Sequence, residues 1–264
     1  MSLHKSMLNV LLDAKTRAGV EHQTGTAGFM QPEDDPELLA AIPKELPILP
    51  LPNRVAYPLS VLPLAVVNPR SVKMIEEALE GNRVIGLLAG KDSSINVPLP
   101  GQVYEVGTVA KIYHVMRTPN NTLRLVVHCL ERSRVKQWLY TEPYLRARIE
   151  LIPDILDSDL ELDALRRTLQ ELVGEIVALS SDVPKEAGDL LNNIKDPRHL
   201  GYMVATCVPL ELPDGQKILE MDKVKDKLRI LISHLLHESN SRPFKRSWVK
   251  QMKRCWLHSN IQKS

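Results

Sequence analysis

Residues 45–64 read ELPILPLPNRVAYPLSVLPL, two short apolar runs interrupted by prolines. Each proline removes a backbone donor and disfavours helix at the residue before it, so short bounded apolar runs favour strands over helices. Proline also confines a strand to a sheet edge, to the first residues of the strand or to a bulge. We therefore expect irregular edge strands whose backbone groups are incompletely paired.

The composition indicates a chain that buries a real core, and the length predicts two folded units rather than one. Its 264 residues are 44% hydrophobic and 25% charged, and 4% are aromatic, so aliphatic side chains must supply most of the core. We find no apolar run of the roughly 18 residues that a membrane span requires, and no secretory cleavage pattern. The cysteines at 129, 207 and 255 lie far apart, which favours a reducing cytoplasm and indicates neither a disulfide framework nor a zinc site.

Charge is distributed unevenly along the chain. Residues 241–264 hold seven basic and no acidic side chains, which leaves −5 for the other 240 residues because the whole chain is +2. Residues 1–44 have few periodic apolar positions and are rich in glycine, proline and acidic residues, so we expect a largely disordered leader.

Alternating apolar patterns after residue 64 predict a small mixed barrel or rolled sheet with one inserted helix. The helix is expected over 71–82, with Ser71 as its N-cap and Gly81 at its end. Gly107 is expected to mark a bulge or a close approach of two backbones. Further strands are expected over residues 83–89, 104–117, 122–135 and 144–152.

Beyond residue 153 the apolar period changes to that of a helix. We expect helices over 157–180, 184–191, 197–206, 213–221 and 222–237, forming a helical bundle. The fold class is therefore α+β. The expected organisation is a leader over 1–44, a β-domain over 45–153, a helical bundle over 154–238 and a basic tail over 239–264.

Several motifs in this order resemble the N-terminal domain of the Lon (La) family of ATP-dependent proteases. They are Pro47-Ile48-Leu49-Pro50-Leu51, Tyr57-Pro58, Leu62-Pro63-Leu64, the YEVGTVA run over 104–110, Asp196-Pro197 through Val204-Ala205, and QKILE over 216–220. The resemblance covers roughly residues 46–238 and implies a PUA-like β-domain followed by the helical bundle. Cys129 departs from the usual glycine of the family, and Pro243 interrupts the long helix that the family carries there. We interpret residues 239–264 as a truncated, frame-shifted or engineered end.

We expect no catalytic, cofactor-binding or metal-binding residue in this chain. It has no GxxxxGK[ST] motif to cradle phosphates, and no segment resembles the catalytic serine region of the family. His114 and His128 are expected on adjacent strands, where surface neighbours are commoner than metal ligands. The acidic residues over 154–163 are interpreted as a solvated cap, since negative charge is favoured at a helix start.

With catalysis and metal binding not expected, the remaining candidate function is binding through a surface. An extended segment of an unfolded protein can add to an incompletely paired edge through main-chain hydrogen bonds. The resemblance implies the same role, the recognition of unfolded or misfolded protein substrates for degradation. The candidate substrate-binding residues are Leu51, Val55, Tyr57, Leu62 and Leu64, with ordinary core packing as the alternative for each.

Two other functions stay open at this point. One is a stand-alone adaptor that binds a protein or small ligand. The other is a nucleic-acid module, for which Trp248 and Trp256 of the basic tail would stack bases, although the net charge of the rest of the chain argues against it. The remaining modules of a Lon-type protease are expected as partners, and the chain by itself is expected to be a monomer or weak dimer.

Overall fold

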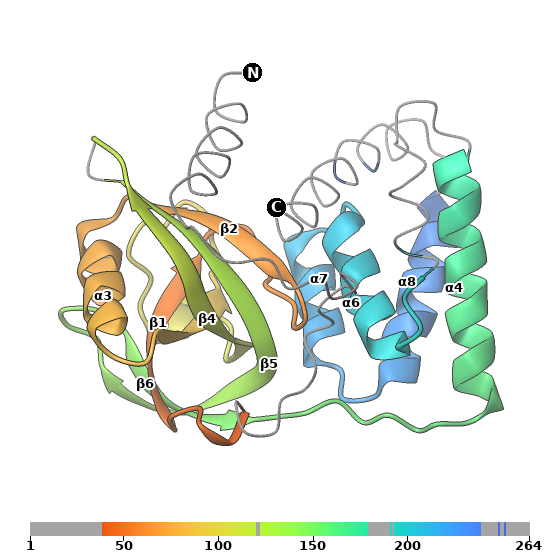
Figure 1. Ribbon diagram of the computed structural model, residues 1–264, viewed down its shortest axis with the longest axis horizontal. Coiled ribbons are helices and arrows are strands. Elements are labelled where there is room, and N and C mark those ends of the chain that lie inside the picture. The colour runs from red at the N-terminus through yellow and green to blue at the C-terminus, as the bar shows by residue number, and fades with distance from the viewer. Residues whose placement is uncertain are drawn as a thin grey trace, which may run out of the picture.

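The computed structural model describes residues 39–119, 122–178, 191, 193–238, 248 and 251. The fold is α+β, with a mixed sheet on one side and a group of helices on the other (Figure 1). The segment that follows the last strand runs along the molecule from the sheet to the first helix of this group. Within these ranges, no helix has the length and apolar character needed to cross a membrane.

The sheet has six strands in the order β2-β5-β4-β3-β1-β6. Strand β6 also pairs with β5, so five strands form a closed ring and β2 lies outside it as an edge. The pairing of β1 with β3 is parallel, and the other pairings are antiparallel. The strands are β1 (Glu45–Leu51), β2 (Val61–Val66), β3 (Val84–Ala89), β4 (Val106–Arg117), β5 (Leu123–Tyr140) and β6 (Arg146–Leu151).

The expectation of proline-bearing edge strands holds for β2 and is wrong for β1. Strand β1 lies inside the ring, where its first residues pair with β6 and its last ones with β3. This change of partner explains how β1 tolerates two prolines, because each half of the strand needs hydrogen bonds along one side only.

The inserted helix α3 spans Pro69–Glu80 and begins earlier than the sequence predicts. Asn68 is the N-cap, and its side chain accepts a hydrogen bond from the backbone N–H of Arg70. The prediction of Ser71 is wrong because Pro69 already suits the first helical position, where its missing N–H costs nothing. Gly81 ends the helix as expected.

Gly107 sits where two backbones approach closely. A Cβ built on it would lie 2.2 Å from the carbonyl oxygen of Leu87. The register shifts of β4 lie elsewhere, after Val109 and after Ile112. Of the two expectations for this glycine, the structure therefore supports close approach and not a bulge.

The predicted helices match the observed ones to within a few residues. The observed elements are α4 (Leu160–Ala178), α6 (Pro197–Cys207), α7 (Leu212–Glu220) and α8 (Val224–Glu238), with a short 3-10 turn, η1 (Pro100–Gln102), in the sheet part. The helix expected over 184–191 falls outside the described residues except for Leu191, as do the leader up to residue 38 and most of the basic tail.

The strands and the helices share one hydrophobic core at their junction. Tyr57 and Val106 come from the sheet side and belong to the same buried cluster as the inward faces of α4, α6, α7 and α8. Trp248 of the tail is also part of this cluster and is 1% exposed. The tail therefore contributes to the core at this residue, so it is not merely an appended end.

Candidate functional site

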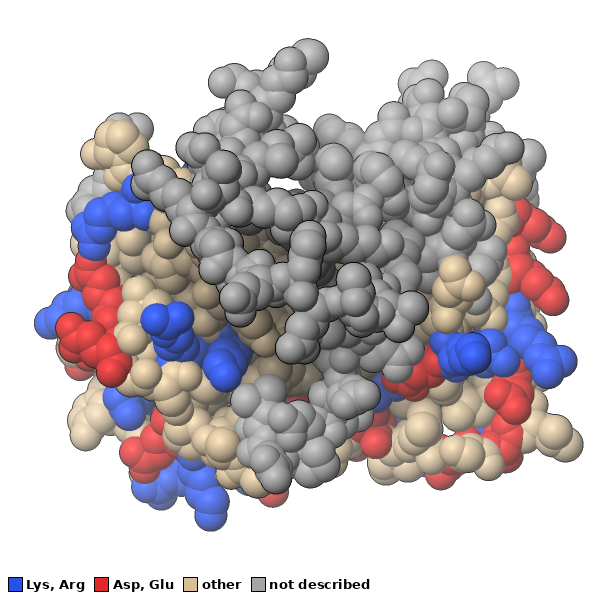
Figure 2. Space-filling model, viewed as in Figure 1, with Lys and Arg blue, Asp and Glu red and all other residues tan. Residues whose placement is uncertain are grey.

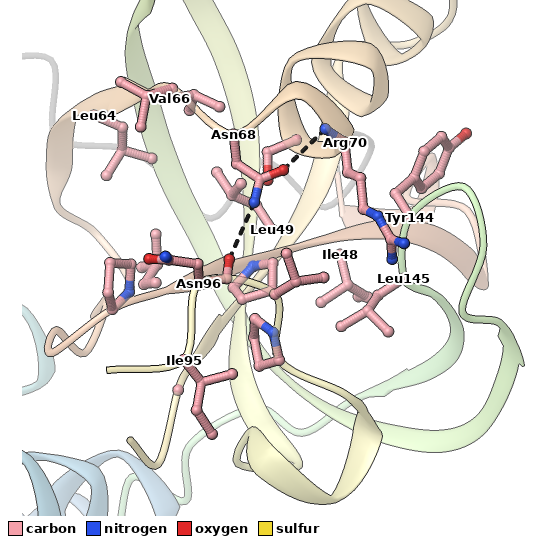
Figure 3. Close-up of a pocket in the computed structure, with 18 of the residues that line it drawn as sticks. Ile48, Leu49, Leu64, Val66, Asn68, Arg70, Ile95, Asn96, Tyr144 and Leu145 are labelled. Carbon is pink, nitrogen blue, oxygen red and sulfur yellow. Dashed lines mark hydrogen bonds between the residues drawn. The ribbon is translucent and has the colours of Figure 1, made fainter. Parts of the chain in front are cut away.

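A pocket of about 700 Å³ opens beside β1, between β2, the start of α3 and the loop over residues 90–99 (Figure 3). This size is in the range of ligand pockets in proteins. Its walls are mostly aliphatic and prolyl side chains. The lining includes Ile48, Leu49, Pro50, Leu51, Pro63, Leu64, Val66, Ile95, Val97, Leu99, Tyr144 and Leu145.

The pocket exists because β1 and β2 both border it without pairing with one another. In the described sheet, β1 pairs with β3 and β6, whereas β2 pairs with β5. Pro50 of β1 and Pro63 of β2 both line the pocket and have no N–H to donate. Prolines on both sides of the gap thus disfavour its closure by direct strand pairing.

The rim of the pocket carries exposed apolar side chains. Val67 is 71% exposed, Leu99 is 54% exposed and Val97 is 42% exposed, and all three line the pocket. Single exposed apolar residues are ordinary, but apolar residues gathered around a concave site are typical of interaction surfaces. We name these three residues the apolar rim.

One hydrogen bond connects the loop over residues 90–99 to the start of α3. The Asn68 side-chain amide donates to the backbone carbonyl of Asn96 at 3.1 Å, while its oxygen caps the helix (Figure 3). Arg70 forms an exposed ion pair with Glu142 at 2.7 Å. Exposed pairs of this kind contribute little free energy, so the polar groups here position the loop more than they define a charged site.

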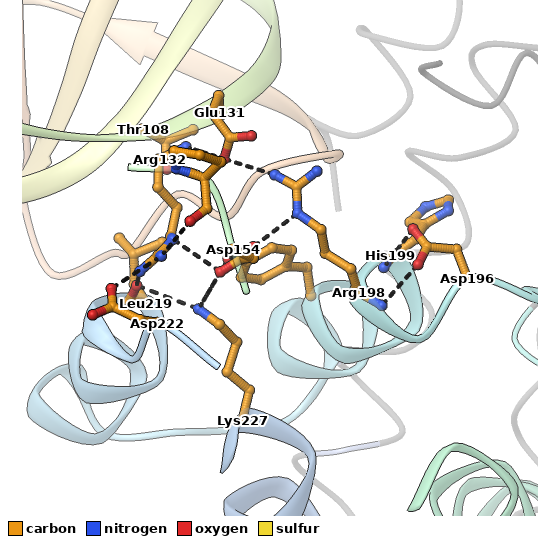
Figure 4. A network of polar contacts seen from close by, with 12 residues as sticks. Thr108, Glu131, Arg132, Asp154, Asp196, Arg198, His199, Leu219, Asp222 and Lys227 are labelled. Carbon is orange, nitrogen blue, oxygen red and sulfur yellow. Dashed lines mark hydrogen bonds and ion pairs between the residues drawn. The ribbon is translucent and has the colours of Figure 1, made fainter. Parts of the chain in front are cut away.

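A second cluster, which we call the Asp154 network, lies at the junction of sheet and helices (Figure 4). The Asp154 carboxylate is fully buried and pairs with Arg132 of β5 at 3.0 Å, Arg198 of α6 at 2.8 Å and Lys227 of α8 at 3.0 Å. The Tyr202 hydroxyl donates to the same carboxylate at 2.6 Å. This single carboxylate therefore joins the segment after β6 to one strand and two helices.

Burial and charge act in opposite directions on the pKa values in this network. Burial by itself raises the pKa of Asp154, but Lys227 and Arg132 outweigh it and hold that pKa below its ordinary value. Burial lowers the pKa of Lys227 to about 8, against the opposing attraction of Asp154. Burial also raises the pKa of Glu131, although Arg198 bonds to it at 2.7 Å. The network is a buried structural junction between the sheet and the helices.

The interpretation of residues 154–163 as a solvated cap is wrong for Asp154. Asp159 does act as a cap, since its carboxylate accepts from the backbone N–H of Leu162 at 3.0 Å. Asp154 precedes the helix and is buried, and its carboxylate pairs with three cationic side chains from distant parts of the sequence. The adjacent charges Glu131 and Arg132 inside an apolar strand were the signal that a buried polar contact was required.

The structure separates the five predicted substrate-binding residues. Leu51 and Leu64 line the pocket and are at the same time buried in the core of the sheet part. Leu62 is buried in the core of the sheet part, and Val55 packs against the helical core. Tyr57 is also buried there, where its hydroxyl donates to the carbonyl oxygen of Gly215 at 3.0 Å and its ring stacks on Tyr202. The residues that the prediction missed are those of the apolar rim and of the loop over 90–99.

The residues considered for other chemistry are dispersed. His114 lies opposite Val126 and His128 opposite Lys111, so the two histidines are not a cross-strand pair. In the part of the chain that the structure describes, no group of three or more His, Cys, Asp and Glu side chains is placed to hold a metal ion. Trp248 is buried, so the idea that its ring stacks on bases is wrong. Figure 2 shows basic and acidic side chains interspersed over the described part of one face.

The described residues thus define a small α+β protein with a shared core and an open apolar pocket, and comparisons with known proteins give its family. Residues 45–237 match the family described as the ATP-dependent protease La (LON) substrate-binding domain. The match covers most of the chain. This chain therefore belongs to that family.

Individual relatives agree with this assignment. The chain is 37% identical over 211 residues to Lon protease 1 of Herpetosiphon aurantiacus, which covers 77% of this chain and 26% of that protein. It is 36% identical over 197 residues to the Lon protease of Dictyoglomus thermophilum, which covers 75% of this chain and 25% of that protein. The chain thus spans about a quarter of the length of these relatives.

Solved structures share the fold. The N-terminal domain of the Mycobacterium avium complex Lon protease matches with a TM-score of 0.61 at 22% identity, over 75% of this chain and 100% of that one. The Lon N-terminal domain protein from Xanthomonas campestris matches with a TM-score of 0.53 at 18% identity, over 72% and 97%. At these identities the likeness concerns the fold alone.

Proposed function

We propose that this chain recognises unfolded or damaged proteins as the substrate-recognition part of a Lon-type ATP-dependent protease. Family membership supports the protease context, and the observation that carries the recognition role is the pocket with its apolar rim. In this proposal the chain itself neither hydrolyses ATP nor cleaves peptide bonds. Those reactions belong to other modules of the protease, which are its partners in the cytoplasm.

The selectivity for unfolded proteins follows from what they expose. A folded protein keeps most Leu, Val and Phe side chains inside, whereas an unfolded one presents them to any concave apolar surface. Burying one such side chain contributes about 1.5–3 kcal/mol, which by itself gives only weak binding. A long unfolded chain offers many such side chains, so repeated capture retains it more strongly than any single contact.

We also infer that the closed sheet is PUA-like and that the helices form a bundle, with boundaries near residues 45, 154 and 239. Within the proposed site, Leu51 and Leu64 form walls of the pocket and the apolar rim makes the first contact with the client. Val55, Tyr57 and Leu62 then act through core packing, the alternative considered for each. A monomer or weak dimer is sufficient for this function.

The proposal is tested by measuring the binding of fluorescently labelled unfolded casein to the full chain. The double variant Val97→Ser/Leu99→Ser removes two rim side chains that are already exposed, so its fold should persist. We expect the dissociation constant to rise about tenfold, since about 1.4 kcal/mol of contact is lost. Leu160→Ser is the matched control, because Leu160 is 89% exposed and does not line the pocket. Equal binding by both variants would overturn the proposal.

A further inference from the structure

The free edge of β2 forms one side of the pocket. Strand β2 pairs with β5 along its whole length, and β5 is its partner in the described sheet. In an antiparallel ladder, alternate residues direct their N–H and C=O groups toward the partner strand and away from it. Half of the backbone groups of β2 therefore point away from β5.

Two observations show which residues of β2 direct their backbone groups away from β5. The backbone N–H of Cys129 in β5 donates to the carbonyl of Ser60 at 2.9 Å, so the even-numbered positions face β5. Pro63, which has no N–H, occupies an odd position opposite Val126. Val61, Pro63 and Ala65 thus direct their backbone groups outward, and Pro63 and Ala65 line the pocket.

The side chains around this edge suit an added strand. The sequence of β2 is VLPLAV, without the charged residue that commonly protects an exposed edge from pairing. Ala65 is small and exposed, so it does not cover the outward backbone groups beside it. Val67 of the apolar rim directly follows β2, and Val97 and Leu99 line the same pocket, so the rim can receive side chains of a chain that runs along β2.

We propose that the ligand of this pocket is an extended polypeptide segment that adds to the free edge of β2 and places alternate apolar side chains against the pocket wall and the apolar rim. This inference rests on the proposed function and specifies the form in which a client is recognised. Main-chain hydrogen bonds to Val61 and Ala65 hold the segment with little dependence on its sequence, and the apolar wall selects segments with alternating aliphatic residues. Because Pro63 has no N–H to donate, only a few main-chain hydrogen bonds hold the segment, and binding is readily reversible.

Ala65→Pro tests the edge from the side of the protein. Residue 65, like the natural Pro63, directs its backbone groups away from β5. The substitution therefore removes an outward N–H, and the hydrogen bonds between β2 and β5 remain. The probe is a labelled peptide of about ten residues, alternating Thr and Val between terminal Gly-Lys pairs. We expect the variant to bind it about fivefold to tenfold more weakly, because one hydrogen bond contributes about 1 kcal/mol net. Ala65→Val keeps the N–H and should bind like the wild type. Circular dichroism and the unfolding midpoint establish whether Ala65→Pro is folded.

N-methylation of the peptide, one residue at a time, tests the same bond with the unaltered protein. Strand addition predicts that methylation at alternate residues weakens binding about tenfold, while methylation between them has a much smaller effect. A flat profile would overturn strand addition. If casein binding still depended on Val97 and Leu99, the proposed function would stand without it. If Ala65→Pro instead converted a dimer into a monomer in light scattering, a second copy of this chain would be the added strand, which also overturns the inference.

Discussion

Arg132 of β5 meets Asp154 at 3.0 Å, and both side chains are fully buried between the sheet and the helices. The guanidinium of Arg132 also donates to the backbone carbonyls of Leu219 and Met221 at 2.9 Å and 2.7 Å. These bonds attach the end of α7 to the strand. The two parts of the fold are thus joined by charge and hydrogen bonds in addition to their shared core.

Neutralising Asp154 should destabilise the whole fold. Asp154→Asn leaves Arg132, Arg198 and Lys227 buried without their common anion. Breaking a buried ion pair in this way costs about 3–5 kcal/mol. Urea unfolding measures the change, with Asp157→Asn as the control, since Asp157 is exposed and forms a long contact of 3.9 Å with Lys223. A loss below about 1 kcal/mol for Asp154→Asn would contradict the structural role of the network.

Lys227 should produce a pH dependence above neutrality. Its pKa is about 8 in the folded protein against 10.5 ordinarily, so between these values the unfolded chain binds more protons. The free energy of unfolding should then rise with pH by up to about 1.4 kcal/mol per pH unit. Urea unfolding at about pH 8 and pH 10, wild type against Lys227→Met, isolates this contribution. Parallel pH profiles for the two proteins would show that Lys227 titrates normally.

Two glycines should respond in opposite ways to alanine. In Gly107→Ala the new Cβ meets the Leu87 carbonyl oxygen at 2.2 Å and Leu88 at 2.4 Å, which we expect to cost about 3 kcal/mol or more. In Gly174→Ala, within α4, the Cβ meets nothing within 4 Å. That change should stabilise the protein by about 0.5–1 kcal/mol. Thermal unfolding of the pair checks both signs, and similar midpoints would refute the close approach at Gly107.

Trp248 should contribute to stability although it lies in the basic tail. It is 1% exposed within the helical core, and Trp→Ala at such a site costs about 3–5 kcal/mol. Tyr140→Ala is the aromatic control, because Tyr140 is 62% exposed, and it should change stability by less than about 0.5 kcal/mol. If Trp248→Ala were equally neutral, the tail would not be part of the folded core.

The strands and helices were predictable because apolar periodicity reports burial within one element. The alternation in residues 104–117 and the helical spacing after residue 157 each predict their elements to within a few residues. The choice between neighbouring candidates for a helix N-cap was harder to predict. Ser71 is a good cap in isolation, but Asn68 followed by Pro69 is better, and the choice depends on three adjacent residues together.

The candidate site was less predictable because it depends on which strands pair. Leu51 and Leu64 were assigned to it from the proline-rich stretch, and both line the pocket. Val97 and Leu99 belong to a loop without periodicity, so nothing local marks them as rim residues. The Asp154 network is similarly hidden, since Arg132, Arg198 and Lys227 are brought together only by the packing of β5, α6 and α8.

The most direct test of the central claim is site-specific crosslinking to a client. The photoreactive residue p-benzoylphenylalanine is placed at position 97 on the apolar rim or, as the control, at position 160, which is more exposed and does not line the pocket. The full chain is then irradiated with labelled unfolded casein. We predict a crosslinked product from position 97, competed away by excess unlabelled casein, and little product from position 160. Equal crosslinking from both positions, or a product from position 160 alone, would contradict recognition at this pocket.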